Sequence, residues 1–178
     1  MIEADDLECV QRTLSGDRNA FGVLVERYQN PVYTLAFRMM GDRDEAEDVA
    51  QAAFVKAYEK LSSFDAGYKF FSWLYRIAHN EAVNALERRQ RHDVLDEETE
   101  AVELAPVRSD LNDIVNSCLL ELSVDHRSVI VLKHFEGLSY DEVARTLGIP
   151  EKKVKSRLFS ARTALRDIMT RKGVRSDD

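Results

Sequence analysis

Apolar residues recur at helical spacing along most of the chain. Near the N-terminus one series joins Leu7, Val10 and Leu14, and the next contains Phe21, Leu24, Val25 and Tyr28. Steps of three and four residues place each series on one face of an amphipathic helix. Only seven glycines and three prolines interrupt 178 residues, so long helices are expected and strands are not. The pattern predicts an all-α fold.

Turn-forming residues divide the first half further. Pro31 is expected to open a third helix, and Gly41 is expected to end it. A fourth helix, whose inner face consists largely of alanines, begins after Asp42 or Asp44, because either carboxylate can cap it. After a further break, a long helix is expected at about residues 70–91.

The pattern changes between residues 92 and 109. This stretch contains six acidic residues, one arginine and Pro106, and its apolar residues follow no sustained period. It is expected to be a flexible acidic linker. Helical periodicity then resumes, so the sequence predicts two small helical domains, at 1–91 and 110–178, each with one modest core.

The most specific local signal lies in the second domain. Ser139 and Glu142 have the spacing of a capping box, Gly148 permits a left-handed turn, and Pro150 suits the start of another helix. These features predict a helix-turn-helix, whose second helix enters the DNA major groove. Its buried stripe is Val154, Leu158, Ala161 and Leu165, which leaves Lys152, Lys153, Lys155, Ser156, Arg157 and Ser160 outside, with Phe159 beside it.

Charge is distributed unevenly along the chain. The formal net charge is -7, yet the stretch from Val143 to Arg175 holds ten Lys or Arg and only two acidic residues. A cationic segment of this kind is typical of a surface that binds a polyanion. A solvated helix face is the ordinary alternative for a run of lysines, but the helix-turn-helix in the same segment favours DNA binding.

Aromatic residues gather between Phe64 and Asn80. Most aromatics at helical spacing are core residues, and Trp73 is expected to be one. Phe64, Tyr68 and Phe70, however, lie in or beside a glycine-containing break, with several lysines and arginines nearby. Unstacked bases and their phosphates are bound by such interleaved rings and cations, so a surface for single-stranded nucleic acid is a second hypothesis.

Other classes of protein find little support. No secretory signal or run of about 18 apolar residues occurs, so a cytoplasmic location is expected. Cys118 falls on an apolar helical stripe, and neither it nor Cys9 is expected to form a disulfide or to act in catalysis. The four histidines lack ligand-type spacing with Cys or carboxylates, so no metal, cofactor or small-molecule substrate is expected. An enzyme is disfavoured.

Three segments together resemble a known family. They are EAEDVAQAAFVKAYEKLSSF (45–64), FFSWLYRIAHNEAVNALERRQR (70–91) and LSYDEVARTLGIPEKKVKSRLFSAR (138–162). The chain is similar, over about residues 5–170, to bacterial sigma factors of the extracytoplasmic-function (ECF) group. The resemblance implies that the first domain is sigma region 2, which binds core RNA polymerase and melts the -10 promoter element. The second domain would be region 4, which reads the -35 element, and an anti-sigma factor would be a further partner.

The resemblance also implies roles for residues of the first domain. Asp48, Gln51 and Val55 would contact core polymerase, although Ala52 stands where the family commonly has a glutamate. The loop at 64–71 would capture a base flipped out of the -10 element. The residues implied at the -10 element are Phe64, Tyr68, Lys69, Phe70, Arg76, Asn80, Asn84 and Arg88. For Asn80, a local helix hydrogen bond is an equal alternative.

In the second domain the implied site lies on the helix after Pro150. Lys155, Ser156 and Phe159 would approach bases, and Arg157, Ser160 and Arg162 would flank them. Lys152 and Lys153 depart from the Gly-Thr pair that is frequent in the family. Two cations at a helix start oppose the helix dipole, which favours a role as phosphate contacts. The acidic linker would thread through polymerase as a nucleic-acid mimic, or would simply be solvated.

One further class of protein stays open. A two-domain regulator could bind an operator with the same helix-turn-helix, while its first domain senses a ligand or pairs subunits. The aromatic, cation-rich loop of the first domain argues against that alternative.

Overall fold

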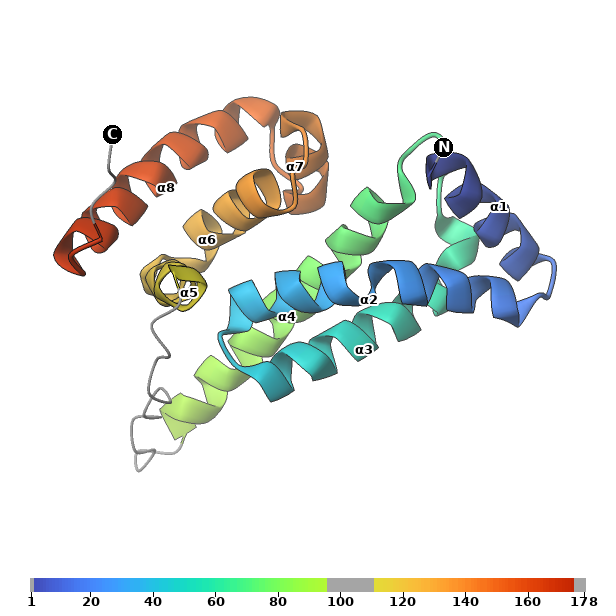
Figure 1. Ribbon diagram of the computed structural model, residues 1–178, viewed down its shortest axis with the longest axis horizontal. Helices are drawn as coiled ribbons and strands as arrows, with labels where there is room; N and C mark the ends of the chain where they lie inside the picture. Colours follow the sequence, from blue (N-terminus) through green and yellow to red (C-terminus); the bar gives the residue numbers. More distant parts are fainter. Residues whose placement is uncertain (1, 96–110, 175–178) are drawn as a thin grey trace.

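The computed structural model describes residues 2–95 and 111–174, and within them all regular structure is helical, as predicted (Figure 1). The first half consists of α1 (Ile2–Leu14), α2 (Arg18–Met40), α3 (Arg43–Glu59), the short η1 (Leu61–Ser63) and α4 (Phe70–Leu95). Helices α2, α3 and α4 pack against one another, and α1 lies against α2. The inner face of α3 is made of Ala46, Val49, Ala50, Ala53 and Ala57, all of which are buried.

The prediction that Pro31 opens a separate helix is wrong. Helix α2 runs through Pro31 without a break, because the φ angle that proline fixes is itself helical and only one backbone hydrogen bond is lost. On either side of Pro31, Tyr28 and Val32 are both buried on the same face. Continuous packing of that face against the core holds the two segments together as one helix.

Helix α4 extends beyond its predicted end. It reaches Leu95, four residues into the stretch that was expected to be linker. No glycine or proline occurs there to end it, and Arg88, Arg89 and Arg91 near its C-terminal end suit the negative end of the helix dipole. The rest of the predicted linker lies outside the described residues, and the division into domains at 91 and 110 stays a prediction.

The second half contains the predicted helix-turn-helix. It consists of α5 (Leu111–Glu121), α6 (Val124–Ile130), the π-helical turn η2 (Val131–Phe135), α7 (Tyr140–Leu147) and α8 (Glu151–Arg171). The Ser139 hydroxyl accepts from the Glu142 backbone, and the Glu142 carboxylate accepts from the Ser139 backbone, which confirms the capping box. Gly148 has φ 64°, so it provides the left-handed turn between α7 and α8.

The two halves pack directly against each other, an arrangement that the sequence did not indicate. Helix α4 contacts α7, and α2 contacts α5, α6 and η2 (Figure 1). The buried apolar residues form a single cluster that includes Met39 and Leu74 of the first half and Leu119 and Leu132 of the second. The chain is therefore closed on itself in this structure.

Candidate nucleic-acid interfaces

The outer face of α8 carries most of the residues predicted to bind duplex DNA. Its exposed side chains are Lys152, Lys153, Lys155, Ser156, Phe159, Ser160 and Arg162. Phe159 is 74% exposed, although an apolar ring of this size is usually buried. Val154, Leu158 and Ala161 anchor the opposite face in the core. The helix thus presents four cations, two hydroxyls and one ring to solvent on a rigid support.

Two of these cations have partners within the chain. The ammonium of Lys155 lies 2.6 Å from a carboxylate oxygen of Glu151, and this hydrogen bond raises the pKa of Lys155. Its Nζ also lies 5.3 Å from the centre of the Tyr140 ring. The Nε of Arg162 donates to Nε2 of His134 over 3.1 Å. Burial, followed by the charges of Arg162 and Lys133, lowers the pKa of His134, which favours the neutral ring that can accept.

Arg157 differs from its neighbours on α8. Its side chain is only 16% exposed, and it pairs with Asp125 of α6 over 2.9 Å. Arg157 has a structural role in this position, because the ion pair joins α8 to α6. In this structure the Arg157 guanidinium is engaged by Asp125, and its expected place beside the bases stays a prediction.

The loop between η1 and α4 is built on a cluster of aromatic rings. Phe64 lies 5.6 Å from the Phe70 ring and 5.4 Å from the Trp73 ring, between centroids, and Phe70 also contacts Tyr28. Phe70 is only 3% exposed. The expectation that Phe70 forms part of the loop's contact surface therefore needs correction, because its ring fills the core beneath the loop. Phe64 is half-buried and supports the loop, as expected.

Tyr68 and Lys69 are the predicted contact residues of this loop whose side chains are exposed. The exposed fractions are 50% for Tyr68 and 48% for the side chain of Lys69. Both face α7 of the other half. The guanidinium carbon of Arg145 lies 4.4 Å from the centre of the Tyr68 ring, and Nζ of Lys69 lies 3.8 Å from a carboxylate oxygen of Glu142.

The remaining residues predicted at the -10 element form one stripe on α4. Arg76, Asn80, Asn84 and Arg88 follow one another at four-residue steps, and all four side chains are exposed. Residues spaced by four lie above one another on a helix face. Two amides between two guanidinium groups thus lie along a single line that begins near the loop.

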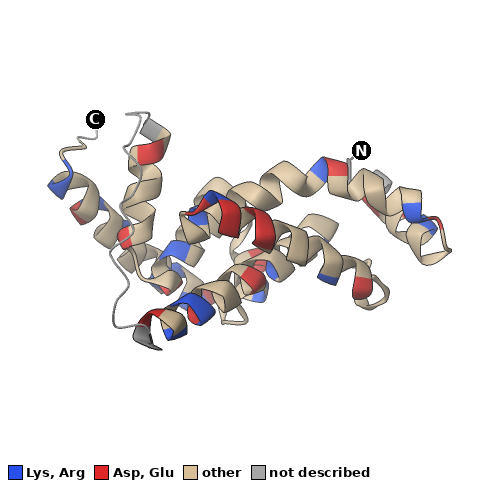
Figure 2. Ribbon diagram, turned by 90° about the horizontal axis from the view of Figure 1, so that it is seen from below, with Lys and Arg blue, Asp and Glu red and all other residues tan. Residues whose placement is uncertain are grey.

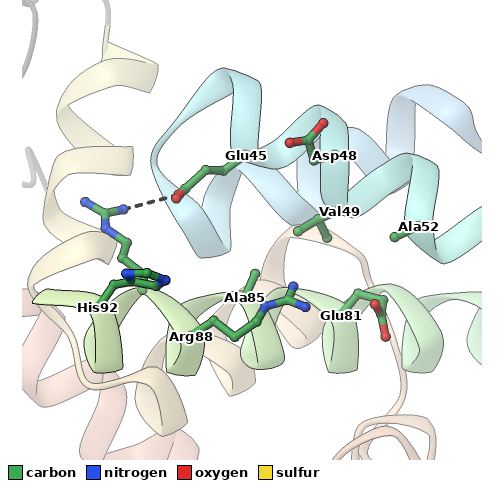
Figure 3. A pocket seen from close by; sticks show the side chains of 9 residues that line it. Glu45, Asp48, Val49, Ala52, Glu81, Ala85, Arg88 and His92 are labelled. Carbon is green, nitrogen blue, oxygen red and sulfur yellow. Dashed lines mark hydrogen bonds and ion pairs between the residues drawn. The ribbon is translucent and has the colours of Figure 1, made fainter. Parts of the chain in front are cut away.

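The predicted polymerase contacts lie on α3. Asp48, Gln51 and Val55 are exposed there, Val55 to 57%. Beside Asp48 a pocket of about 540 Å³ opens between α3 and α4 (Figure 3). Its lining comprises Glu45, Asp48, Val49, Ala52, Glu81, Ala85, Arg88, Arg89 and His92. Ala52, which stands where the resembled family commonly has a glutamate, contributes only a methyl group to this wall.

Charges of both signs surround this pocket. The first turns of α3 are acidic, and the last turns of α4 carry several arginines (Figure 2). Nη1 of Arg89 donates to Glu45 over 3.2 Å, and both residues line the pocket. Lys56 and Glu81 form a second ion pair between the same two helices. No sequence pattern identified this pocket, because residues of two separate helices line it.

Sequence reasoning also missed the polar residues that join the two halves. Arg127 donates to the backbone oxygens of Leu119 (2.9 Å), Leu120 (2.8 Å), Leu122 (3.1 Å) and, across the interface, Met39. Burial lowers its pKa. Arginines are usually exposed, and nothing in the local pattern distinguishes this one.

Two further polar contacts cross the same interface. Nε2 of His79 lies 2.8 Å from the Ser128 hydroxyl, and burial lowers the pKa of His79 to about 4. The Glu136 carboxylate lies 3.5 Å from Arg38, whose guanidinium covers the Phe135 ring at 4.2 Å. Burial raises the pKa of Glu136 despite the opposing effects of Tyr75 and Arg38. The sequence indicated nothing about His79 beyond its lack of metal-ligand spacing.

The described ranges, 2–95 and 111–174, contain neither a cluster of metal ligands nor a membrane-spanning helix. No group of three or more His, Cys, Asp or Glu residues there could hold a metal ion. The helices of that part of the chain include none with the length and apolar character needed to span a bilayer. Cys9 and Cys118 are both buried free thiols.

Comparison with known proteins matches both halves. Residues 24–92 match sigma-70 region 2, and residues 112–165 match sigma-70 region 4. The chain is 37% identical over 181 residues to the RNA polymerase sigma-H factor of Pseudomonas aeruginosa, covering 93% of this chain and 94% of that protein. It is 36% identical over 173 residues to the ECF RNA polymerase sigma factor SigW of Bacillus subtilis, covering 88% and 92%.

A solved structure shares the same fold. It is the sigma factor RpoE in a co-crystal with the anti-sigma factor NepR from Bartonella quintana, with 28% identity, a TM-score of 0.73, and coverage of 84% of this chain and 96% of that chain. The matches to regions 2 and 4 lie on the two halves that carry the aromatic loop and the helix-turn-helix. The chain therefore belongs to the ECF group of the sigma-70 family of RNA polymerase sigma factors.

Proposed function

We propose that this sigma factor reads the -35 element with α8, engages the single-stranded -10 element with the loop before α4, and binds core polymerase through α3. The observation that carries the proposal is the outer face of α8. Its exposed cations, hydroxyls and Phe159 ring stand on the second helix of a capped helix-turn-helix. In such units that helix enters the major groove with its N-terminal residues near base edges.

Within α8 we assign different tasks to successive residues. Lys152 and Lys153 lie in the first turn and bind phosphates, while Lys155, Ser156 and Phe159 approach base edges one turn later. Ser160 and Arg162 continue the exposed face. Arg157 keeps its ion pair with Asp125 and acts by positioning α8 rather than by touching DNA.

For the -10 element we assign the exposed loop residues and the stripe on α4. The Tyr68 ring offers a face on which a flipped base can stack, and Lys69 offers a cation for a phosphate. Asn80 and Asn84 would read exposed base edges, between the phosphate contacts of Arg76 and Arg88. Phe64 and Phe70 support this surface from beneath.

For core polymerase we assign the exposed face of α3 that carries Asp48, Gln51 and Val55. An exposed valine between polar residues suits a protein contact, because covering a water-facing apolar side chain with a partner stabilises the complex. We further propose control by an anti-sigma factor. The co-crystal of the similar sigma factor RpoE with NepR supports this assignment.

Multi-round transcription with purified core polymerase tests the function. A template library of promoters is transcribed by core alone, by core with this chain, and by core with a variant in which Asp48, Gln51 and Val55 are replaced by Ala. The chain is expected to start specific transcripts that core alone does not, and the variant is expected to lose them. If specific transcripts appear only when a second sigma factor is added, the chain is an operator-binding regulator and the proposal fails.

A further inference from the structure

Helix α7 of the second half lies against the start of α4 and the loop that precedes it. The two elements are in contact, and they meet through charged and aromatic side chains rather than through apolar packing alone. Tyr68, Lys69 and Ser72 contribute from the first half, and Glu142 and Arg145 contribute from α7. Two of these residues, Tyr68 and Lys69, are assigned to single-stranded DNA in the proposed function.

The first contact covers the face of an exposed ring. The guanidinium of Arg145 lies over the Tyr68 ring, with its central carbon 4.4 Å from the ring centre. Both a nucleobase and a guanidinium bind an aromatic ring through its face, and both are planar. Arg145 therefore occupies the position in which a captured base would stack on that side of Tyr68.

The second contact places a carboxylate beside a cation. One Glu142 oxygen accepts from the Ser72 hydroxyl over 3.1 Å and lies 3.8 Å from Nζ of Lys69. Burial opposes ionisation of Glu142, but hydrogen bonds from Ser139 and Ser72 and the charge of Lys69 together lower its pKa. An ionised carboxylate held between a hydroxyl and an ammonium group matches the anionic oxygens of a DNA phosphate.

We propose that α7 masks the -10 surface from within the same chain, with Arg145 on Tyr68 in place of a base and Glu142 on Lys69 and Ser72 in place of a phosphate. Single-stranded DNA then binds the loop only when α7 moves away from it. The inference rests on the proposed role of the loop in binding single-stranded DNA.

The masking acts on one of the two DNA surfaces. The outer face of α8 remains open in the closed chain, with Phe159 at 74% exposure. The duplex-binding helix is therefore available while α7 engages Tyr68 and Lys69 of the single-strand surface. A closed chain is expected to bind duplex DNA without rearrangement and to bind single-stranded DNA only at the cost of breaking the α7 contacts.

A double variant, E142Q/R145Q, tests the masking in the full chain. Glutamine at position 142 keeps the capping box, because its side-chain oxygen can still accept from the Ser139 backbone. The net charge of the chain does not change, so general attraction to DNA is preserved. The matched control is E121Q/R171Q, which removes an exposed ion pair of 3.2 Å between α5 and α8 within the second half, also without changing the net charge.

The readout is the fluorescence anisotropy of a fluorescein-labelled single-stranded DNA 12-mer of randomised sequence. E142Q/R145Q is expected to bind about three- to tenfold more tightly than the unaltered chain, a range set by the typical strength of an exposed cation–π contact and ion pair. E121Q/R171Q is expected to bind as the unaltered chain does. Y68A/K69A, introduced into both backgrounds, reports how much of the binding uses the loop.

The outcomes separate the two proposals. A gain in affinity that Y68A/K69A abolishes supports the masking. Equal affinities of E142Q/R145Q and the unaltered chain, with both weakened by Y68A/K69A, would overturn the masking and leave the role of the loop intact. Affinities that do not depend on Tyr68 and Lys69 in either background would overturn the proposed role of the loop, and the masking with it.

Discussion

The guanidinium of Arg127 in α6 donates a hydrogen bond to the backbone oxygen of Met39 in α2, across the boundary between the two halves of the chain. The same group also donates to three backbone oxygens at the end of α5. Leu119, Leu120 and Met39 lie in the last turns of α5 and α2, and Leu122 directly follows α5, in regions where carbonyl oxygens commonly lack intrahelical partners. One buried side chain thus satisfies the ends of two helices and ties them to α6.

Replacing Arg127 with Met is expected to lower the free energy of unfolding by about 2 to 4 kcal/mol. Methionine fills similar volume and removes a buried charge, but it removes the side-chain donor that the four carbonyl oxygens share. Urea denaturation followed by circular dichroism measures the change. Arg166→Met on the exposed face of α8 is the control and should change stability by less than about 0.5 kcal/mol. Equal stability of the two variants would show that the hydrogen bonds of Arg127 contribute nothing.

A side chain at Gly41 is expected to destabilise the fold. Its φ angle is 76°, and a Cβ atom there would overlap the side chain of Leu120 from the other half. Backbone strain alone costs about 1 to 3 kcal/mol. Gly41→Ala should therefore lower the free energy of unfolding by more than this amount, and should raise the radius of gyration in small-angle scattering.

Gly137 provides the matched control for Gly41. It has φ 68°, and a Cβ atom would meet nothing within 4 Å. Gly137→Ala thus measures strain without overlap, and adding Leu120→Ala to Gly41→Ala should restore part of the stability. If the two glycine variants were equally stable and equally compact, the close approach of α5 to Gly41 would be disproved.

Acid is expected to weaken the fold through His79. Burial lowers its pKa to about 4 in the folded chain, whereas an unfolded histidine titrates near 6.5. At a pH between these values His79 binds a proton in the unfolded chain but not in the folded chain. The free energy of unfolding therefore falls as the pH falls from 6.5 towards 4. The slope is about 1.4 kcal/mol per pH unit for this group.

The variant His79→Gln isolates this contribution, because Glu136 and the other titrating groups remain in both proteins. Its free energy of unfolding should depend less steeply on pH between 4 and 6.5 than that of the unaltered chain. The exposed His92 provides the control, and His92→Gln should leave the slope as it is. Parallel pH profiles for the unaltered chain and His79→Gln would contradict the assignment.

The salt dependence of DNA binding tests Lys152 and Lys153. If both bind phosphates, changing both to Ala weakens binding to -35 duplexes of every sequence. The slope of log affinity against log salt should become shallower by roughly 0.9 for each phosphate that the variant no longer neutralises. A binding titration at several salt concentrations measures it. An unchanged slope would reject the phosphate role.

Base readout is tested by Lys155 and Ser156. Their replacement with Ala should alter preference at particular base pairs, by about 1 to 3 kcal/mol at each for a good contact, in a competition assay with singly substituted -35 duplexes. Arg157→Ala should instead act through stability, since its side chain pairs with Asp125. A uniform loss of affinity across all duplexes for the Lys155 and Ser156 variants would argue against base readout.

Local features of this fold were predictable because short-range chemistry determines them. The capping box at Ser139 and Glu142 and the left-handed turn at Gly148 depend on residues within a few positions of each other, and both are confirmed. The prediction for Pro31 was wrong because proline is common at a helix start, whereas here the packing of Tyr28 and Val32 keeps Pro31 inside a helix.

Features that depend on distant residues were not predictable in the same way. Phe70 was expected at the surface from its neighbours in sequence, but the Tyr28 ring from α2 covers it. The closed arrangement depends on pairs such as Arg127 with Met39, which are 88 positions apart and carry no periodic signal. The α8 face was found because exposure follows from helical spacing alone, whereas the pocket beside Ala52 required two helices to be placed.

The aromatic cluster beneath the loop has a practical consequence. Trp73 is the only tryptophan in the chain, and its indole lies 5.4 Å from the Phe64 ring and 5.7 Å from the Phe70 ring. Tryptophan fluorescence of this chain therefore comes from the aromatic cluster beneath the surface assigned to the -10 element. Any event that shifts Phe64 changes the polarity around this single fluorophore, so the unlabelled protein contains an optical reporter at the place where promoter melting would be sensed.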